Sequence, residues 1–299
     1  MRTIDRYETL HRLWPVMAIV VSMTLGGCAS RSAYVAFADS GVAFNNAMLW
    51  VSASSRRLTM DRESELLLSQ MPGRSPAQRR ANLESADNSD QLAVQALNQL
   101  DMSSRLMKSY FDALKSLAST NAPQQVGEEL NTAATNLTNF VNTAGSGDGT
   151  EISAAAPAVS GLASGLAGFT VDAALKRELN SRVSVLERAF DLQEFALDEL
   201  VSIVEENIDI IADKRQVRMV RTPYVSGRLT STRAQNSWIE SRADLALLPN
   251  KVDAISDAKK QVKTMRENFV KLRDGKITAA ELDSFTSQLA TFVGHIQAL

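Results

Sequence analysis

Cysteine and histidine are nearly absent from this sequence. Among its 299 residues, Cys28 is the only cysteine, and His11 and His295 are the only histidines. A disulfide within these residues is therefore excluded, and so is a zinc site built on several cysteine or histidine ligands. A Ser-His-Asp triad would have to use His295, within an apolar stripe near the end of the chain. We therefore expect no catalytic residue and no metal ligand.

Phosphate-binding loops and a strong positive charge are also missing. Neither the Gly-x-x-x-x-Gly-Lys-Ser/Thr nor the Gly-x-Gly-x-x-Gly pattern occurs. The 32 Lys and Arg residues are balanced by 34 Asp and Glu residues, which gives a formal net charge of -2. A protein of this charge has no overall field that attracts nucleic acid. We expect no nucleic-acid partner and no non-covalent cofactor.

The N-terminus has the order of a secretory signal. Three arginines lie within the first twelve residues, and an apolar run follows at 15–27. A basic region, 7–15 apolar residues and small residues at the cleavage point define such a signal. The apolar run is shorter than the roughly 20 residues that cross a bilayer as a helix. A cleaved signal is therefore favoured, with a single transmembrane anchor as the alternative.

The end of this run is the tetrad Leu25-Gly26-Gly27-Cys28, which resembles the lipobox of bacterial lipoproteins. The resemblance implies that Leu25, Gly26 and Gly27 are recognised by the signal peptidase, which cleaves before Cys28. It also implies diacylglycerol on the Cys28 thiol and an acyl chain such as palmitate on the new N-terminus. Residues 1–27 would be the signal peptide and 28–299 the mature chain. The remaining alternative is a cleaved signal followed by an ordinary cysteine.

The residue after Cys28 bears on localisation. Two or three acyl chains tether a protein firmly, whereas one chain holds it only marginally. In the lipoproteins that this tetrad resembles, an aspartate at the next position often signals inner-membrane retention, and here the residue is Ala29. We expect a lipid-anchored protein of the bacterial cell envelope, at the outer membrane, with its body in the periplasm.

The mature chain has a composition and a periodicity that predict helices. Proline occurs only seven times, and apolar residues recur at alternating spacings of three and four. Flexible connectors are expected at about 71–90 and at 145–151. The expected helices are 32–70, 89–119, 123–143, 172–221 and 278–299, with shorter ones within 227–248 and from 249 to 272.

Each expected helix carries one apolar stripe, which must be buried against another helix to be stable in water. Short turns favour antiparallel neighbours. The sequence therefore predicts an all-α fold: one domain, 28–299, built as an elongated antiparallel helical bundle that is partly coiled-coil-like. The stripes of the first two helices are Tyr34, Phe37, Gly41, Phe44, Met48, Val51, Ser55 and Leu58, and Leu97, Leu100, Ser104, Met107, Phe111, Leu114 and Ala118.

The segment 152–171 differs from the rest because it contains no charged residue. It includes a Gly-x-x-x-Gly motif, which packs helices closely in lipid, and its setting is similar to that of the hydrophobic tongue in helical pore-forming toxins of the haemolysin E type. Small residues and Pro157 argue against a spanning helix, so buried packing is favoured, with a flexible connector and then membrane contact as the alternatives. The residues expected to contact a membrane, if the segment does so, are Gly161, Leu162, Gly165, Leu166 and Phe169.

Two further groups of residues have ordinary interpretations. Asp191, Glu194, Asp198, Glu205 and Asp209 lie on one face of the expected long helix, and we expect this to be its solvated face. The stretch 274–282 resembles the second half of an EF-hand loop, but Val270 and Leu272 occupy the positions of the first ligands. We expect a helix–turn–helix corner here, capped by Thr278 and Glu281.

These observations lead to three hypotheses of different classes. The favoured one is a non-enzymatic module that binds an envelope protein or serves as a scaffold. The alternative is a membrane-active bundle that engages a second bilayer through 152–171. An unrecognised hydrolase with scattered carboxylates is the third.

Overall fold

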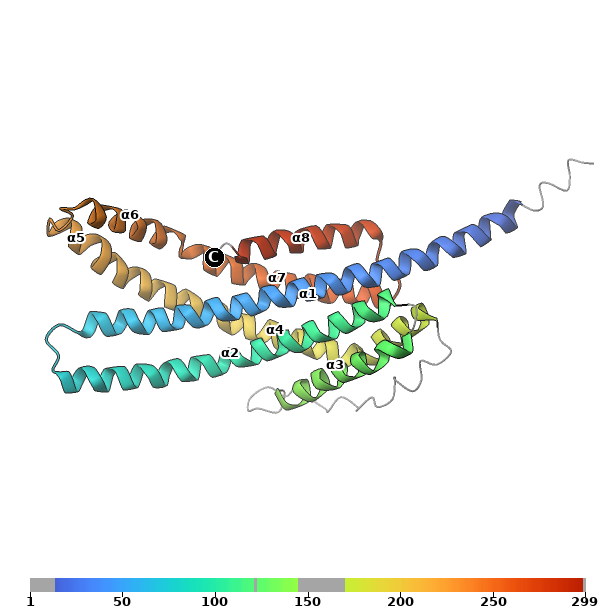
Figure 1. The fold of residues 1–299 in the computed structure, drawn as a ribbon, viewed down its shortest axis with the longest axis horizontal. Helices are drawn as coiled ribbons and strands as arrows, with labels where there is room; N and C mark the ends of the chain where they lie inside the picture. The colour runs from blue at the N-terminus through green and yellow to red at the C-terminus, as the bar shows by residue number, and fades with distance from the viewer. Residues whose placement is uncertain (1–13, 121–122, 145–169, 298–299) are drawn as a thin grey trace, which may run out of the picture.

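The computed structural model describes residues 14–120, 123–144 and 170–297, with side chains at 31–89, 94, 97–120, 126–144 and 170–297. This part of the chain is all-α, as predicted, and forms a long helical bundle (Figure 1). The helices are α1 (Trp14–Gln70), α2 (Pro76–Ser119), α3 (Pro123–Ala144), α4 (Val171–Arg215), the π-helix η2 (Gln216–Arg221), α5 (Thr222–Val225), α6 (Thr232–Leu247), α7 (Pro249–Arg273) and α8 (Ala279–Gln297).

Helix α1 is the axis of the bundle and spans about 85 Å at 1.5 Å per residue. All eight residues of its predicted stripe are buried, which confirms the stripe. The predicted start at Ser32 is wrong, because the helix begins at Trp14. No proline lies between Pro15, which a first turn tolerates, and Pro72, which follows the last turn.

The prediction of a connector at 71–90 is wrong for most of its length, because α2 already begins at Pro76. The Ser75 hydroxyl accepts a hydrogen bond from the Gln78 backbone N–H at 3.3 Å. The Gln78 side-chain oxygen accepts one from the Ser75 backbone N–H at 3.0 Å. This capping box starts a helix whose first turns are polar because they project into solvent.

The directions of the helices differ from the predicted antiparallel arrangement. Helices α1 and α2 are antiparallel, since Asp39 pairs with Lys115 while Arg56 bonds Asn98. Helices α1 and α4 are parallel, as shown by two buried hydrogen bonds with the same offset in sequence: Gln193 donates to Asn45 at 2.9 Å, and Asn207 donates to Thr59 at 3.3 Å.

Helices α3 and α4 are also parallel, although they follow each other in the chain (Figure 1). Arg182 of α4 bonds Asn131 of α3, and further along both helices Phe140 and Ala144 lie with Leu192 and Ala196. The antiparallel prediction is therefore wrong at this pair. The rule that short turns favour antiparallel neighbours does not apply to this pair, because residues 145–169 separate the two helices.

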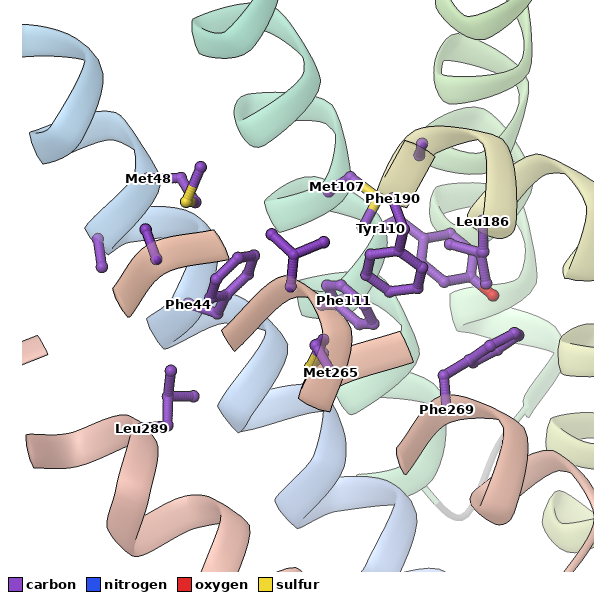
Figure 2. Close-up of a cluster of buried hydrophobic side chains, with 14 of the residues drawn as sticks. Phe44, Met48, Met107, Tyr110, Phe111, Leu186, Phe190, Met265, Phe269 and Leu289 are labelled. Atoms are coloured by element: carbon purple, nitrogen blue, oxygen red, sulfur yellow. The ribbon is translucent and has the colours of Figure 1, made fainter. Parts of the chain in front are cut away.

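The core lies between α1, α2, α3, α4, α7 and α8, and Figure 2 shows a cluster of its buried side chains. The Phe111 ring meets Phe37 edge to face at 5.8 Å between centroids. Phe269 of α7 lies 6.3 Å from Phe190 of α4. A Cβ atom on Gly41 would come within 2.5 Å of the Phe111 ring, so the glycine lets α2 approach α1 closely.

The predicted end of the long helix at residue 221, just before Thr222-Pro223, is also wrong. The α-helix changes to a π-helix at Gln216, and α5 continues past Pro223 to Val225. Thr222 keeps a helical conformation, with φ -61° and ψ -49°, and its N–H bonds the carbonyl of Val217 five residues back. The wider hydrogen-bonding of a π-helix replaces the regular pattern just before the proline ring.

Two parts of the bundle are distinguished below. The proximal part is the region around Phe37 and Phe44, where α1, α2, α3, α4, α7 and α8 lie together. The distal part lies beyond the ends of α3 and α8 and contains the end of α1, the start of α2, the end of α4, and η2, α5 and α6 (Figure 1).

Candidate functional site

The predicted lipid-attachment tetrad lies on α1. The backbone of Leu25, Gly26, Gly27 and Cys28 is helical and continuous with the rest of α1. Three residues after Cys28, the Arg31 guanidinium bonds the carbonyls of Ala118 and Thr120 at the end of α2. The tetrad therefore precedes the point where α1 joins the bundle, and lipidation and cleavage there stay predictions.

The predicted membrane-contact residues Gly161, Leu162, Gly165, Leu166 and Phe169 lie outside the described residues. Buried packing, a flexible connector and membrane contact therefore all stay predictions for residues 152–171. Across the helices that the structure does describe, none is both long enough and apolar enough to cross a membrane.

An apolar groove of about 260 Å³ opens between α2, α4 and the end of α3. Its floor includes Leu97 and Leu200, which are buried, and its rim includes Phe195 and Ile203, which are 55% and 41% exposed. Single exposed apolar side chains are common, but here two of them border one apolar groove. The lining residues are Thr59, Leu97, Gln99, Leu100, Ser103, Phe140, Ala144, Leu192, Phe195, Ala196, Glu199, Leu200 and Ile203.

The groove exists because α3 ends before its neighbours do. Up to Ala144, α3 covers α2 and α4 with the buried side chains of Leu137 and Val141. Beyond Ala144, α2 and α4 continue toward the distal end, and their surfaces continue the interface that α3 occupies upstream. The groove is thus an open position for one further helix, in line with α3.

The lining of the groove is mostly apolar. Glu199 is the one ionisable side chain among the lining residues, and the polar ones are Thr59, Gln99 and Ser103. The Ser103 hydroxyl donates to the Leu100 carbonyl of its own helix at 2.9 Å. The lining residues include no histidine, lysine or second carboxylate beside Glu199. The groove can bury apolar side chains of a ligand.

The acidic residues predicted on the solvated face of α4 lie at the surface, and three of them pair with α7. Asp191 pairs with Arg266, Glu194 lies 3.7 Å from Lys263, and Asp198 pairs with Lys259. Glu205 and Asp209 are exposed. Asp191, Glu194 and Asp198 therefore connect α4 to α7.

The α7–α8 corner has the predicted cap. The Glu281 carboxylate accepts from the Thr278 backbone N–H at 3.0 Å, and the Thr278 hydroxyl accepts from the Glu281 N–H at 3.2 Å. Lys271 donates to the same carboxylate at 2.8 Å. The bonds from Lys271 and Thr278 lower the pKa of Glu281 to about 2. The interpretation as a capped corner is confirmed.

Two buried charged clusters were not anticipated from the sequence. In the proximal part, Glu178 and Arg182 are both nearly inaccessible and pair at 3.4 Å, beside Tyr110. Burial raises the pKa of Glu178 more than Arg182 and Tyr110 lower it. Their spacing of four, each one residue before an apolar residue at the same spacing, Leu179 and Val183, was an available signal.

The second buried cluster is in the distal part, around Glu65. This carboxylate accepts from Arg215 at 2.8 Å and from Arg218 at 2.6 Å and 3.1 Å. Burial raises the pKa of Glu65, but the hydrogen bonds and charges of Arg218 and Arg215 outweigh it, so the pKa lies below the ordinary 4.5. Neither this cluster nor the Glu178 cluster lines the groove.

Sequence reasoning also missed Phe195 and Ile203, because it followed only one stripe on the long helix. Leu192, Ala196 and Ile203 form a second line at helical spacing, and this line was the available signal. Within the described ranges, no three His, Cys, Asp or Glu side chains lie together in a way that would hold a metal ion. No family model matches this chain, and no curated protein or solved structure is similar to it.

Proposed function

We propose that this chain is a non-enzymatic helical lipoprotein of the bacterial cell envelope that binds an amphipathic helix of a partner protein. The observation that carries the proposal is the apolar groove in line with α3. The lipobox-like tetrad at Cys28 supports the envelope location, and Ala29 supports the outer membrane, with the body in the periplasm.

The continuity of the groove with an existing interface supports a helix as the ligand. Upstream, α2 and α4 receive α3, a helix with an apolar stripe that includes Leu130, Leu137 and Val141. A helix-in-groove partner presents anchors at i, i+3, i+4 and i+7 in the same way. The exposed rings and branched side chains at the rim, Phe195 and Ile203, are suited to close around such anchors.

Site-specific photo-crosslinking in intact bacteria tests this proposal. Photoreactive residues at Gln99 on α2 and at Ile203 on α4 label the two walls of the groove. The matched control is Glu205, which is exposed on the same helix two residues further on and does not line the groove. We expect both wall positions to capture one segment of one partner, at attachment points spaced three or four residues apart.

The variant Phe195→Asp adds a second criterion. Phe195 is a surface residue, so its replacement should change the free energy of unfolding by no more than about 0.5 kcal/mol, yet it should abolish the adducts. Adducts with residues 145–169 of the same chain, adducts with a second copy, or equal capture at Glu205 would each contradict the proposal.

The lipid anchor has its own test. Cys28→Ala should yield an uncleaved precursor that carries no lipid, as measured by mass spectrometry of the membrane fraction. A processed, lipid-bearing product from this variant would overturn the lipoprotein part of the proposal without affecting the groove.

A further inference from the structure

The distal end of the molecule carries a local positive charge, although the net charge of the whole sequence is -2. Between Lys214 and Ile239 the sequence contains no acidic residue and six basic ones. They are Lys214, Arg215, Arg218, Arg221, Arg228 and Arg233. We call this stretch, 214–239, the distal surface; it comprises the end of α4, η2, α5 and most of the first two turns of α6.

Three of these six basic side chains form no ion pair with the other described residues. Arg215 and Arg218 bind Glu65, and Lys214 pairs with Asp213. Arg221, Arg228 and Arg233 are exposed, and the ion pairs among the described residues do not include them. Three cations therefore face solvent within thirteen residues of each other.

The same surface exposes large apolar side chains. Val225 is 76% exposed, Tyr224 is 66% exposed, and Ile239 is 58% exposed. Arg221 and Val225 line the same shallow hollow, together with Val217, so cationic and apolar side chains are neighbours. Exposed apolar groups next to arginines are the arrangement that binds a membrane interface.

The scaffold of the distal surface is well fixed. The Trp238 indole donates to the Val220 carbonyl at 3.0 Å, and Tyr224 stacks on Trp238 with 5.6 Å between ring centroids. The Arg242 guanidinium covers the Trp238 ring at 4.8 Å. The α5–α6 corner, with Gly227 at φ +67°, is thereby held as a projecting wedge at the end of the bundle.

A second corner at the same end has the same character. The turn between α1 and α2 lies at the end of the molecule where α5 and α6 meet (Figure 1). Met71 and Leu83 are each 50% exposed. Arg74 and Arg80 are exposed as well, and no acidic residue occurs between Leu66 and Leu83.

We propose that the distal surface binds the interface of a bilayer that contains anionic phospholipid. The charge of the surface is complementary to anionic headgroups, and Val225 and Ile239 would enter the headgroup region. These aliphatic side chains argue for a bilayer over nucleic acid, which binds through phosphates and stacked bases. One face of the Tyr224 ring is already covered by Trp238. This contact is independent of the groove and of residues 152–171.

The position of the distal surface gives the contact a consequence. From Cys28 to Gln70, α1 spans about 64 Å at 1.5 Å per residue, and the distal surface lies beside the far end of this helix. A lipid on Cys28 and a membrane-binding wedge at 214–239 would thus act at opposite ends of one rigid bundle.

The test uses Trp238 as a local probe in the full chain carrying Trp14→Phe and Trp50→Phe. Vesicles contain phosphatidylcholine alone or with phosphatidylglycerol, and their brominated acyl chains quench the Trp238 indole when the distal surface lies against the bilayer. We expect quenching only with the anionic vesicles, and its loss at high salt. Equal quenching in phosphatidylcholine alone, or none in either, would overturn the proposal.

Two triple variants separate the surface from overall charge. Arg221→Glu, Arg228→Glu and Arg233→Glu together should weaken partitioning about 100-fold or more, at about 1 kcal/mol for each lost cation and 1.4 kcal/mol for each tenfold change. Lys176→Glu, Lys263→Glu and Lys276→Glu make the same charge change elsewhere, at exposed lysines, and should keep most of the binding.

Equal loss in both triple variants would show non-specific attraction and contradict the proposal. A change of Trp238 emission with single-stranded RNA, but not with anionic vesicles, would identify a polyanion site instead. Unfolding midpoints of both triple variants confirm that any loss is not due to misfolding.

Discussion

The proximal and distal parts of this bundle are built on the same three helices, α1, α2 and α4, yet they are held together differently. In the proximal part, the additional helices α3, α7 and α8 enclose an aromatic core that includes Phe37, Phe111 and Phe269. In the distal part, α1 and α4 meet through the Thr59–Asn207 hydrogen bond and the Glu65–Arg215 ion pair.

The difference follows from the number of neighbours that each level of the bundle has. A stripe that is enclosed on several sides can be mostly apolar, because little of it meets water. Buried polar contacts join α1 to α4 at both levels, through Asn45 and Gln193 in the proximal part and through Thr59 and Asn207 further along. Past the end of α3, apolar surface of α2 and α4 is left as the groove. The proximal part therefore has the more enclosed core, the groove lies at the end of α3, and the distal surface lies in the distal part.

The largest expected effect is that of Phe111→Ala in the proximal core. Phe111 is fully buried and contacts Phe37 and Tyr110. Truncation should lower the free energy of unfolding by about 3–5 kcal/mol, because it removes apolar burial and leaves a cavity. Urea unfolding monitored by circular dichroism measures it. The control Val217→Ala, in the distal part, should stay within about 0.5 kcal/mol; equal effects would refute the contrast.

The next effect is that of Glu65→Gln in the distal part, which takes the carboxylate from Arg218 and leaves Arg215 paired with Asp61 alone, at 3.1 Å. A loss of about 1–3 kcal/mol is expected for a buried charged hydrogen-bond network. The folded pKa of Glu65 lies below 4.5, so the unfolded chain binds more protons in that window. The contribution is complete above about pH 4.5 and is lost as pH falls through the folded pKa. In the Glu65→Gln variant, the free energy of unfolding should therefore fall less steeply as the pH is lowered below about 4.5.

Glu178→Gln in the proximal part should change the pH dependence in the opposite direction. Burial holds the pKa of Glu178 above 4.5, so the folded chain binds more protons between 4.5 and the raised value. Stability from this group is present at low pH and falls as pH rises through that window. Unfolding free energies measured across pH for both glutamine variants would sharpen the comparison. Identical pH profiles for the two variants would contradict it.

A smaller effect tests the close contact of α1 and α2. Gly41→Ala should be destabilising by about 1–2 kcal/mol, because overpacking against the Phe111 ring exceeds the gain in helix propensity. Gly294→Ala on α8 is the control, since no atom lies within 4 Å of the added Cβ. It should stabilise by about 0.5–1 kcal/mol. Thermal unfolding of the two variants should therefore shift in opposite directions.

The proximal part was more predictable from the sequence than the distal part, for a physical reason. Heptad spacing reports which face of a helix is buried, and the stripes around Phe37 and Phe111 followed it. The parallel pairing of α3 and α4 depends on residues 145–169, whose length permits either direction. The polar start of α2 was mistaken for a connector, although Ser75 and Gln78 already formed a capping signal.

The groove was harder to predict, because it exists only where α3 no longer covers α2 and α4. Ile203 looks like an ordinary helical residue until α3 is seen to end at Ala144. The charges of the distal surface were visible in the sequence, but whether Arg221 or Arg215 is paired depends on Glu65, which is about 150 residues away. Such partners follow from the tertiary arrangement alone.

The smallest expected effects concern two capping boxes, one in each part. Ser75 begins α2 at the distal end, and Thr278 begins α8 at the proximal end, and each makes the same reciprocal hydrogen bonds. Loss of an N-cap costs about 1 kcal/mol, so Ser75→Ala and Thr278→Ala should lower the free energy of unfolding similarly.

Their local effects should differ, because α2 starts in a thin part of the bundle with few packed neighbours. Hydrogen exchange should quicken over residues 76–90 in Ser75→Ala, and much less over 279–290 in Thr278→Ala, where Leu282, Phe285 and Leu289 are buried against the core. Equal local opening at both caps would mean that packing density does not distinguish the two parts.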